Sequence, residues 1–145
     1  FSFMIKKIYI AGPLFNKHEQ TYLEEIAKEL EGNGYDCFLP HRDQTGIDES
    51  ELKGTDMSQE TKDRIFKNDL NALDDADLTV ALLTGQDIDS GTSAEIGHTF
   101  ANEKPVIAIN AYERRYRNLF VEGMLTVTVN DIGEIIPEIE KLGWN

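Results

Sequence analysis

Residues 78–83 read Leu-Thr-Val-Ala-Leu-Leu, and this run decides the fold class. A nearly continuous apolar run of this length is typical of a strand that is covered on both faces, as strands of parallel sheets are. The segment before it has an apolar stripe at helical spacing and can be capped by Ser58; the stripe consists of Ile65, Phe66, Leu70 and Leu73. A second helix is predicted after the run, over residues 91–102. The order helix, strand, helix indicates crossover connections between parallel strands.

The rest of the chain repeats this alternation. Four further short, β-rich runs are predicted to be strands, at residues 7–11, 37–39, 106–109 and 126–129. A helix capped by Asn16 follows the first of them and stops at Gly-Asn-Gly, residues 32–34, and an amphipathic helix over 132–142 closes the chain. The pattern predicts an α/β protein with a mostly parallel five-stranded sheet and helices on both faces.

Length and composition limit the classes of function. The 145 residues fit a single domain, 1–145, in which residues 1–6 are expected to form a terminal extension. Acidic residues number 27 against 14 basic ones, a formal net charge of -13, and such a surface repels phosphate backbones and anionic lipid. No apolar run approaches the roughly 18 residues of a membrane helix. We therefore expect a cytoplasmic protein that binds neither a nucleic-acid polymer nor a membrane, with its one cysteine, Cys37, in the core.

Ligands of parallel sheets bind at the carboxyl ends of the strands. This rule selects four segments of the chain before any motif is considered: 12–16, 41–57, 84–90 and 110–117. The longest of them, 41–57, is polar, contains two glycines and has no hydrophobic period, so it is predicted to be a loop.

Several kinds of site do not fit these segments. The turn at residues 11–15 lacks the glycine pattern of a dinucleotide site, and residues 85–92 lack the lysine of a P-loop. His98 follows Glu95 by three residues, a spacing that could hold a metal, but the sequence has no second such pair. None of the three histidines has an evident serine partner. We expect neither a metal nor a cofactor.

Three carboxylates remain as candidates for chemistry. Asp89 and Glu95 lie at the start of the helix that follows the apolar strand, and Asp69 lies in the helix before it. A carboxylate near a helix N-terminus stays ionised and can attack an anomeric carbon, while a second one transfers a proton to the leaving group. The plainer alternatives are a helix cap for Asp89 and solvated surface acids for the other two. Gly91 and Gly97 favour catalysis, because glycines beside an acid allow close approach.

Several motifs occur in an order that is more specific than any one of them: residues 9–16 (YIAGPLFN), 67–70 (KNDL) with 75–77 (DAD), 89–97 (DSGTSAEIG) with 104–106 (KPV), and, more weakly, 118–120 (NLF). Together they resemble the nucleoside 2-deoxyribosyltransferase family over most of the chain. The resemblance implies a flavodoxin-like (Rossmann-like) sandwich, no cofactor, and a homo-oligomer whose subunits share their sites.

The resemblance also implies three catalytic roles. Glu95 matches the nucleophile, which would attack C1′ of a 2′-deoxynucleoside and hold the sugar covalently until a second base attacks the same carbon, with net retention. Asp69 matches the acid that donates to, or hydrogen-bonds, the departing base. Tyr9 matches the tyrosine whose hydroxyl orients the nucleophile. A core position for Tyr9 and a solvated helical position for Asp69 remain open.

Five further residues are expected at the substrate by the same resemblance. Asp89 matches the carboxylate that binds the 5′-hydroxyl, and Asn118 matches an asparagine lent to the neighbouring subunit's site for that hydroxyl. Phe15 would pack on the base, Gln44 resembles a base-contacting glutamine, and Gly12 belongs to the opening turn of the site. Alternatively, Phe15 is a hydrophobic staple for the first helix and Asn118 a turn residue.

The predicted function is exchange of the base of a 2′-deoxynucleoside, with the nucleoside and a free nucleobase as partners. The nearest alternative is an N-glycoside hydrolase of nucleosides or of 5′-monophosphates. An anion at Asp89 should repel a phosphate, but Arg114, Arg115 and Arg117 could receive one, unless they form a solvated loop or a subunit contact. An alternative of another class is a non-catalytic nucleotide-binding module. The choice of base depends on the shape of segment 41–57.

Overall fold

The strands of this protein form one parallel sheet. The structure is a computed structural model that describes residues 4–53, 56–85, 87–110 and 118–143. The sheet has the order β2-β1-β3-β4-β5, and every neighbouring pair is parallel. This is the strand order of the flavodoxin-like fold, so the predicted fold class is confirmed. The strands are β1 (Lys7–Ala11), β2 (Asp36–Phe38), β3 (Leu78–Leu83), β4 (Val106–Asn110) and β5 (Val127–Val129).

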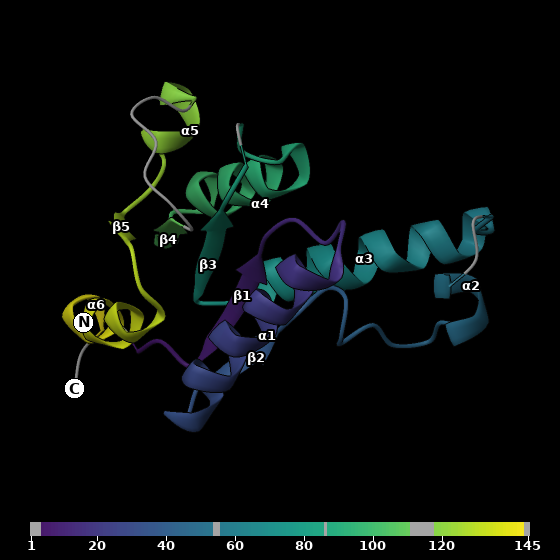
Figure 1. Ribbon diagram of the computed structural model, residues 1–145, viewed down its shortest axis with the longest axis horizontal. Coiled ribbons are helices and arrows are strands. Elements are labelled where there is room, and N and C mark those ends of the chain that lie inside the picture. Colours follow the sequence, from purple (N-terminus) through teal and green to yellow (C-terminus); the bar gives the residue numbers. More distant parts are fainter. Residues whose placement is uncertain (1–3, 54–55, 86, 111–117, 144–145) are drawn as a thin grey trace.

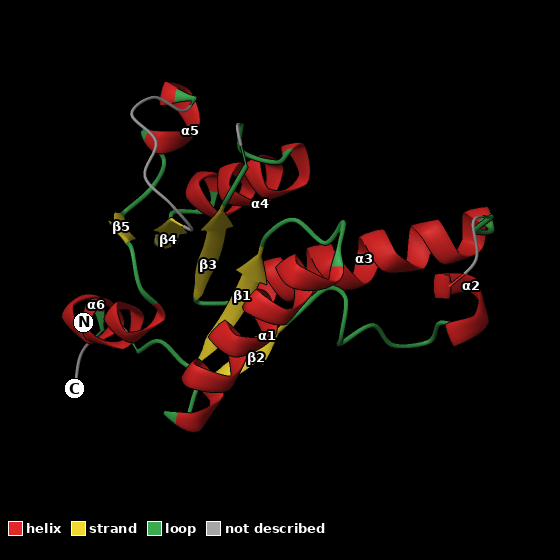
Figure 2. Cartoon of the chain, viewed as in Figure 1, coloured by secondary structure: helices red, strands yellow, loops and turns green. Residues whose placement is uncertain are grey.

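Helices cover both faces of the sheet, as Figures 1 and 2 show. On one face α1 (Lys17–Gly32) and α6 (Ile135–Leu142) pack against alternate strand residues such as Ile8 and Ile10. On the other face α3 (Gln59–Asp75) and α4 (Ser90–Ala101) pack against the intervening ones, among them Tyr9. The strand period of two therefore places Tyr9 on the α3/α4 face.

The helix starts predicted at Asn16 and Ser58 are confirmed. The Asn16 side chain accepts a hydrogen bond from the backbone N–H of Glu19, and the Glu19 side chain accepts one from the N–H of Phe15. Ser58 caps α3 by accepting from the N–H of Thr61. Both side chains satisfy donors that a helix N-terminus leaves without partners.

The structure corrects the secondary structure in three places. A short helix, α2 (Glu49–Lys53), lies in the segment predicted to be a loop, and α5 (Leu119–Glu122) was not predicted. The helix predicted over 132–142 begins as a 3-10 turn (Ile132–Glu134) before α6. Neither short helix has an apolar period; α2 is instead tied to the start of α3 by Glu51, which accepts from the N–H of Ser58.

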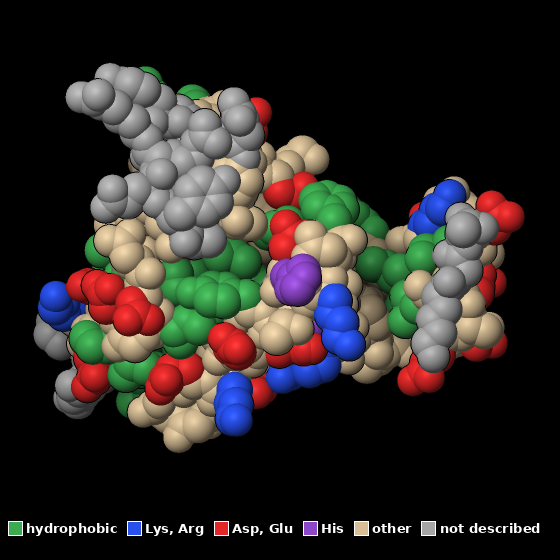
Figure 3. All heavy atoms as spheres, viewed as in Figure 1, with side chains coloured by type: hydrophobic (Ala, Val, Ile, Leu, Met, Phe, Trp, Pro, Cys, Tyr) green, Lys and Arg blue, Asp and Glu red, His purple; other side chains and the backbone are tan. Residues whose placement is uncertain are grey.

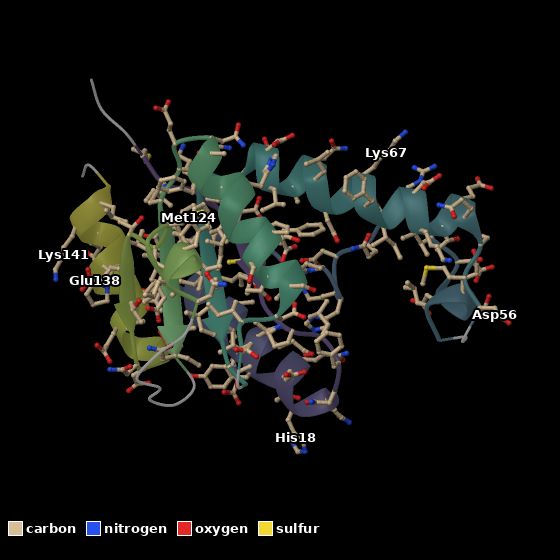
Figure 4. The ribbon with its side chains drawn as sticks, turned by 90° about the horizontal axis from the view of Figure 1, so that it is seen from above. His18, Asp56, Lys67, Met124, Glu138 and Lys141 are labelled. Carbon is tan, nitrogen blue, oxygen red and sulfur yellow. The ribbon has the colours of Figure 1, made fainter. Side chains whose placement is uncertain are left out.

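The N-terminal half of helix α3 projects past the sheet edge together with α2 (Figures 1 and 4). Leu73, near the end of α3 beside the sheet, is buried, whereas Phe66 is 66% exposed. The predicted apolar stripe is therefore buried at Leu73 and exposed at Phe66. An apolar stripe is buried only as far as the sheet reaches.

The residues just before β1 pack against the rest of the domain. Ile5 is buried in the core, and the backbone N–H groups of Lys6 and Lys7 both donate to Asp77 Oδ2. Residues 5 and 6 thus join the domain instead of extending away from it.

No helix within the described residues is long and apolar enough to cross a membrane. Figure 3 shows acidic side chains spread over the visible face.

Candidate active site

Tyr9, Asp69 and Glu95 come together although each lies on a different element. Tyr9 is on β1, Asp69 on α3 and Glu95 on α4, and all three face the same side of the sheet. The Tyr9 hydroxyl donates a hydrogen bond to Glu95 Oε2. The structure therefore unites a hydroxyl and two carboxylates near the carboxyl end of β1, where the strand rule expected a site.

The Tyr9 ring is held rigidly. It is fully buried and stacks on Phe38 of the neighbouring strand, with ring centroids 5.6 Å apart and an interplanar angle of 20°. The two residues are register partners in the β1/β2 ladder. Tyr9 is thus a core residue whose hydroxyl reaches a polar site, so the core alternative and the orienting role are compatible.

The backbone of Glu95 is anchored to the sheet by a chain of hydroxyl groups. The Thr99 hydroxyl donates to the carbonyl oxygen of Glu95 at 2.9 Å, and it lies 2.8 Å from the hydroxyl of Thr79 on β3. Because Thr99 has one hydroxyl proton and gives it to Glu95, the proton between the two threonines comes from Thr79. Both threonines are buried, and this pair fixes the turn of α4 that carries Glu95.

Burial and neighbouring charges act on the protonation of the site. Burial raises the pKa of Glu95 to about 7, with smaller contributions from the negative charges of Asp69 and Asp89, while the hydrogen bond from Tyr9 acts in the opposite direction. Burial, together with the charge of Glu95, raises the pKa of Tyr9 far above its ordinary value. Tyr9 therefore stays a hydrogen-bond donor at every physiological pH. Glu95 titrates near neutrality, so the expectation that its place near a helix N-terminus keeps it ionised is wrong: burial outweighs the effect of the helix end.

Asp69 is held by Gln44 from the segment after β2. Gln44 Nε2 donates to Asp69 Oδ1 at 2.8 Å and to the carbonyl oxygen of Pro40 at 2.7 Å. Burial raises the pKa of Asp69, and the Gln44 hydrogen bond opposes that shift. Asp69 is consequently more easily protonated than an exposed aspartate, as a proton donor requires.

A cavity of about 340 Å³ lies between α3 and α4, with both carboxylates in its wall. This volume is at the lower end of the range for small-molecule sites, roughly 300–1,000 Å³. Its wall is otherwise mainly apolar and includes Phe66, and Gly91 lines it with no side chain. The lining residues are Phe66, Asp69, Leu70, Leu73, Gly91, Ala94, Glu95 and His98. Gly97 instead faces Met124, which Figure 4 shows beside α4.

Asp89 and Asn118 both cap helices. Asp89 Oδ2 accepts from the N–H and from the hydroxyl of Thr92, each at 3.1 Å, at the start of α4. Asn118 accepts from the N–H groups of Phe120 and Val121 at the start of α5. The cap interpretation of Asp89 is confirmed. Its Oδ2 also lies 3.3 Å from the place where a Cβ on Gly91 would stand, and Gly91 lines the cavity. The described contacts of Asn118 are those of the cap.

The other predicted substrate residues differ in what surrounds them. Phe15 is 79% exposed, so it is not buried as a hydrophobic staple and its ring is accessible. Gln44 uses both of its N–H groups within the protein. A Cβ at Gly12 would lie 2.7 Å from Leu23 Cδ2 and 3.2 Å from Leu82 Cβ, so close packing of the turn accounts for this glycine. Arg114, Arg115 and Arg117 lie outside the described residues.

His98 forms a pair with an aspartate of the neighbouring helix. Its Nε2 lies 2.7 Å from Asp74 Oδ1, a contact between α4 and α3. Within the described ranges, no three His, Cys, Asp or Glu side chains are grouped so as to hold a metal ion. His98 thus joins two helices beside the cavity.

Sequence reasoning gave no role to three residues that support the site: Phe38 behind Tyr9, Thr99 behind Glu95, and Asn68, which donates to Gln44 Oε1. Asn68 stands next to Asp69 in the 67–70 motif, and this position could have indicated that it supports the site. Phe38 and Thr99 look like ordinary strand and helix residues, and only their neighbours in space give them a role.

The flavodoxin-like sheet, with a tyrosine-bound glutamate and a half-buried aspartate near the carboxyl end of β1, defines an α/β protein with two carboxylates in the wall of one cavity. The sequence model of the nucleoside 2-deoxyribosyltransferase family matches residues 8–138. The chain belongs to this family.

Known proteins of related sequence and structure agree with this assignment. A nucleoside deoxyribosyltransferase of Limosilactobacillus fermentum is 31% identical over 108 residues, which are 71% of this chain and 64% of that protein, so the chain spans less than two thirds of that relative's length. The solved 2-deoxyribosyltransferase of Bacillus psychrosaccharolyticus is 26% identical, with a TM-score of 0.75 over 89% of each chain. The CMP N-glycosidase of Clostridium botulinum, 20% identical, has a TM-score of 0.60 over 93% of this chain and 99% of its own and shares the fold.

Proposed function

We propose that this protein exchanges the base of 2′-deoxynucleosides through a covalent deoxyribosyl intermediate on Glu95. The observation that carries the proposal is the hydrogen bond from Tyr9 to Glu95 Oε2 in the wall of a cavity that also contains Asp69. The family of the chain and the names of its relatives support the same reaction.

The geometry suggests how the first half of the reaction proceeds. Tyr9 engages Oε2, which leaves Oε1 of Glu95 to attack C1′ of the deoxyribose. A bond forms between Oε1 and C1′ while the bond from C1′ to the base nitrogen breaks, and its electron pair leaves with the base. Asp69 gives its proton to that base. A raised pKa at Asp69 makes the proton available.

The second half reverses these steps with another base. The incoming base attacks C1′, Glu95 leaves as a carboxylate, and the proton of the incoming base passes to Asp69. Two inversions give net retention. Water in place of the second base would give hydrolysis with the same residues, so the acceptor decides between the two reactions.

We also propose that the protein acts as a homo-oligomer. Phe100, Leu119 and Phe120 are exposed around an apolar groove of about 780 Å³ between α4 and α5. Exposed apolar surface of this kind is typical of a subunit interface. In such an oligomer Asn118, at the start of α5, would serve the site of the neighbouring subunit. Light scattering after gel filtration tests this: a monomer at micromolar concentration would contradict it.

Chromatography of deoxyinosine incubated with the protein, with and without adenine, tests the reaction. We expect deoxyadenosine only when adenine is present, and an adduct of one deoxyribosyl group on the intact protein by mass spectrometry. Glu95→Ala should remove both, whereas Glu25→Ala, at an exposed glutamate of α1, should leave them unchanged.

Other outcomes would redirect the assignment. Hypoxanthine release that does not depend on adenine would indicate a hydrolase. Turnover by Glu95→Ala comparable to wild type would exclude the covalent role. No reaction with any purine or pyrimidine deoxynucleoside or its monophosphate would leave a binding module.

A further inference from the structure

Two side-chain amides and a carboxylate form a continuous hydrogen-bonded row behind the cavity. Asn68 Nδ2 donates to Gln44 Oε1 at 3.0 Å, and Gln44 Nε2 donates to Asp69 Oδ1 at 2.8 Å. Asn68 and Asp69 are consecutive residues of α3, whereas Gln44 comes from the segment that follows β2. Lys67, the preceding residue, points outward from α3 in Figure 4, whereas the side chains of Asn68 and Asp69 both contact Gln44.

Main-chain carbonyl groups fix the orientation of both amides. Asn68 Nδ2 also donates to the carbonyl oxygen of Thr45 at 2.9 Å, and Gln44 Nε2 to that of Pro40 at 2.7 Å. A carbonyl oxygen can only accept a hydrogen bond, so each amide must present its nitrogen to it. With Asn68 fixed in this way, its second N–H meets the oxygen of Gln44. Rotation of the Gln44 amide would bring nitrogen against nitrogen there and oxygen against oxygen at Pro40 and Asp69.

This arrangement also distinguishes the two oxygens of Asp69. Oδ1 receives the Gln44 hydrogen bond, and among the described residues no hydrogen bond reaches Oδ2. The oxygen without a donor is the better place for a proton, because protonation there displaces no hydrogen bond. Asp69 lines the cavity, so a proton on Oδ2 is the one available to a bound base.

We infer that Asn68 is a positioning residue that acts through Gln44: it locks the Gln44 amide with its nitrogen toward Asp69 Oδ1 and so reserves Oδ2 for the proton exchanged with the nucleobase. The inference rests on the proposed function and adds two points to it. It gives Asn68 a role without contact to the substrate, and it assigns Gln44 primarily to Asp69, since both N–H groups of Gln44 are already occupied.

The test compares Asn68→Leu, Gln44→Leu and the double variant. Leucine approximates the size of asparagine but has no N–H group, so packing is kept while the hydrogen bonds are lost. Asn71→Leu is the matched control, since Asn71 is exposed on the same helix. If Asn68→Leu does not fold, Asn68→Ala replaces it. Steady-state base exchange and carbon-13 titration of the Asp69 carboxyl group, assigned with Asp69→Asn, are measured for each protein.

We expect Asn68→Leu to lower kcat about ten-fold, the scale of a small misplacement of a catalytic group, with KM within about two-fold. The pKa of Asp69 should rise in Asn68→Leu and rise further in Gln44→Leu, because a donor to the carboxylate is weakened and then removed. The double variant should match Gln44→Leu alone, since Asn68 acts through Gln44.

Two results would overturn the inference. One is an Asn68→Leu protein whose kcat and Asp69 titration equal those of Asn71→Leu. The other is a double variant whose loss is the sum of the two single losses. The titration needs no turnover, so a wild type without base exchange would refute the proposed function and still leave the row of amides tested.

Discussion

The hydroxyl of Tyr9 donates a hydrogen bond to Oε2 of Glu95, a residue 86 positions further along the chain. This contact engages one oxygen of the carboxylate, and Glu95 also lines the cavity. It also favours the ionised form of Glu95 against the effect of burial, which raises the pKa of this group to about 7. The tyrosine thus affects both the direction and the charge of the glutamate.

Tyr9→Phe should shift the pH dependence of turnover. The reactive form of Glu95 is the carboxylate, so activity should rise with pH through about 7 in the wild type. Without the Tyr9 hydroxyl the pKa of Glu95 rises further, and the acidic limb of kcat/KM against pH should move to higher pH. Tyr35→Phe, on the other side of the sheet, is the control. An unmoved acidic limb in Tyr9→Phe would contradict this account.

Gly12→Ala should destabilise the fold. The added Cβ would lie 2.7 Å from Leu23 Cδ2, and Leu82 Cβ blocks the other side at 3.2 Å. Relief of such a clash in a packed core costs roughly 1–3 kcal/mol. Gly32→Ala is the matched control: its Cβ meets nothing within 4 Å, and it should be neutral or stabilising by up to about 1 kcal/mol. Urea denaturation measures both, and equal effects would refute the packing argument.

Thr99→Val should lower both the free energy of unfolding and the rate of turnover. Valine has a similar shape but removes the donor to the Glu95 carbonyl and leaves the Thr79 hydroxyl buried without its partner. An unsatisfied buried hydroxyl costs about 1–3 kcal/mol. Thr128→Val, at an exposed position of β5, should change the free energy of unfolding by less than about 0.5 kcal/mol. A Thr99→Val protein as stable as this control would show that the buried pair contributes little.

Substitutions of Asp89 should separate the contribution of its helix cap to stability from the effect of its negative charge on substrate preference. Asp89→Ala removes the acceptor for the Thr92 N–H and should cost about 1 kcal/mol, whereas Asp89→Asn keeps an acceptor oxygen and most of that stability. Both should weaken deoxynucleoside turnover. The asparagine variant removes the anion, so its preference for a 5′-hydroxyl over a 5′-phosphate should decline. Competition between deoxyinosine and its monophosphate measures this preference; an unchanged ratio would show that the charge does not select.

Hydrophobic periodicity predicted the elements of the fold that are extensively buried. The continuous apolar run at 78–83 is the central strand, with all six residues buried. Hydrophobic periodicity was a poor guide where elements are only partly buried. Phe66 lies on a helix that outruns the sheet, and Glu49–Lys53 forms a helix through polar contacts to Ser58 and Thr61, which leave no apolar period.

The candidate site was less accessible to sequence reasoning than the fold. The strand period accounts for the face on which Tyr9 lies, and the positions of Asp69 and Glu95 at the edge of the sheet follow from the element order. Asp69 and Glu95 were candidates from residue type and position, whereas Tyr9 joined them only through the family resemblance. The role of Gln44 depends on the path of segment 41–57, which has no regular pattern, and so the contact to Asp69 was not predictable.

The long separation between Tyr9 and Glu95 also has a consequence for how the protein acquires its activity. Crossover connections must close large loops before β1, β3 and α4 can pack, and such non-local pairing is slow compared with local helix formation. A nascent or partly denatured chain that retains its helices would lack the joined hydroxyl and carboxylate. Recovery of turnover after dilution from denaturant should therefore lag behind recovery of helical circular dichroism and report the last docking step of folding.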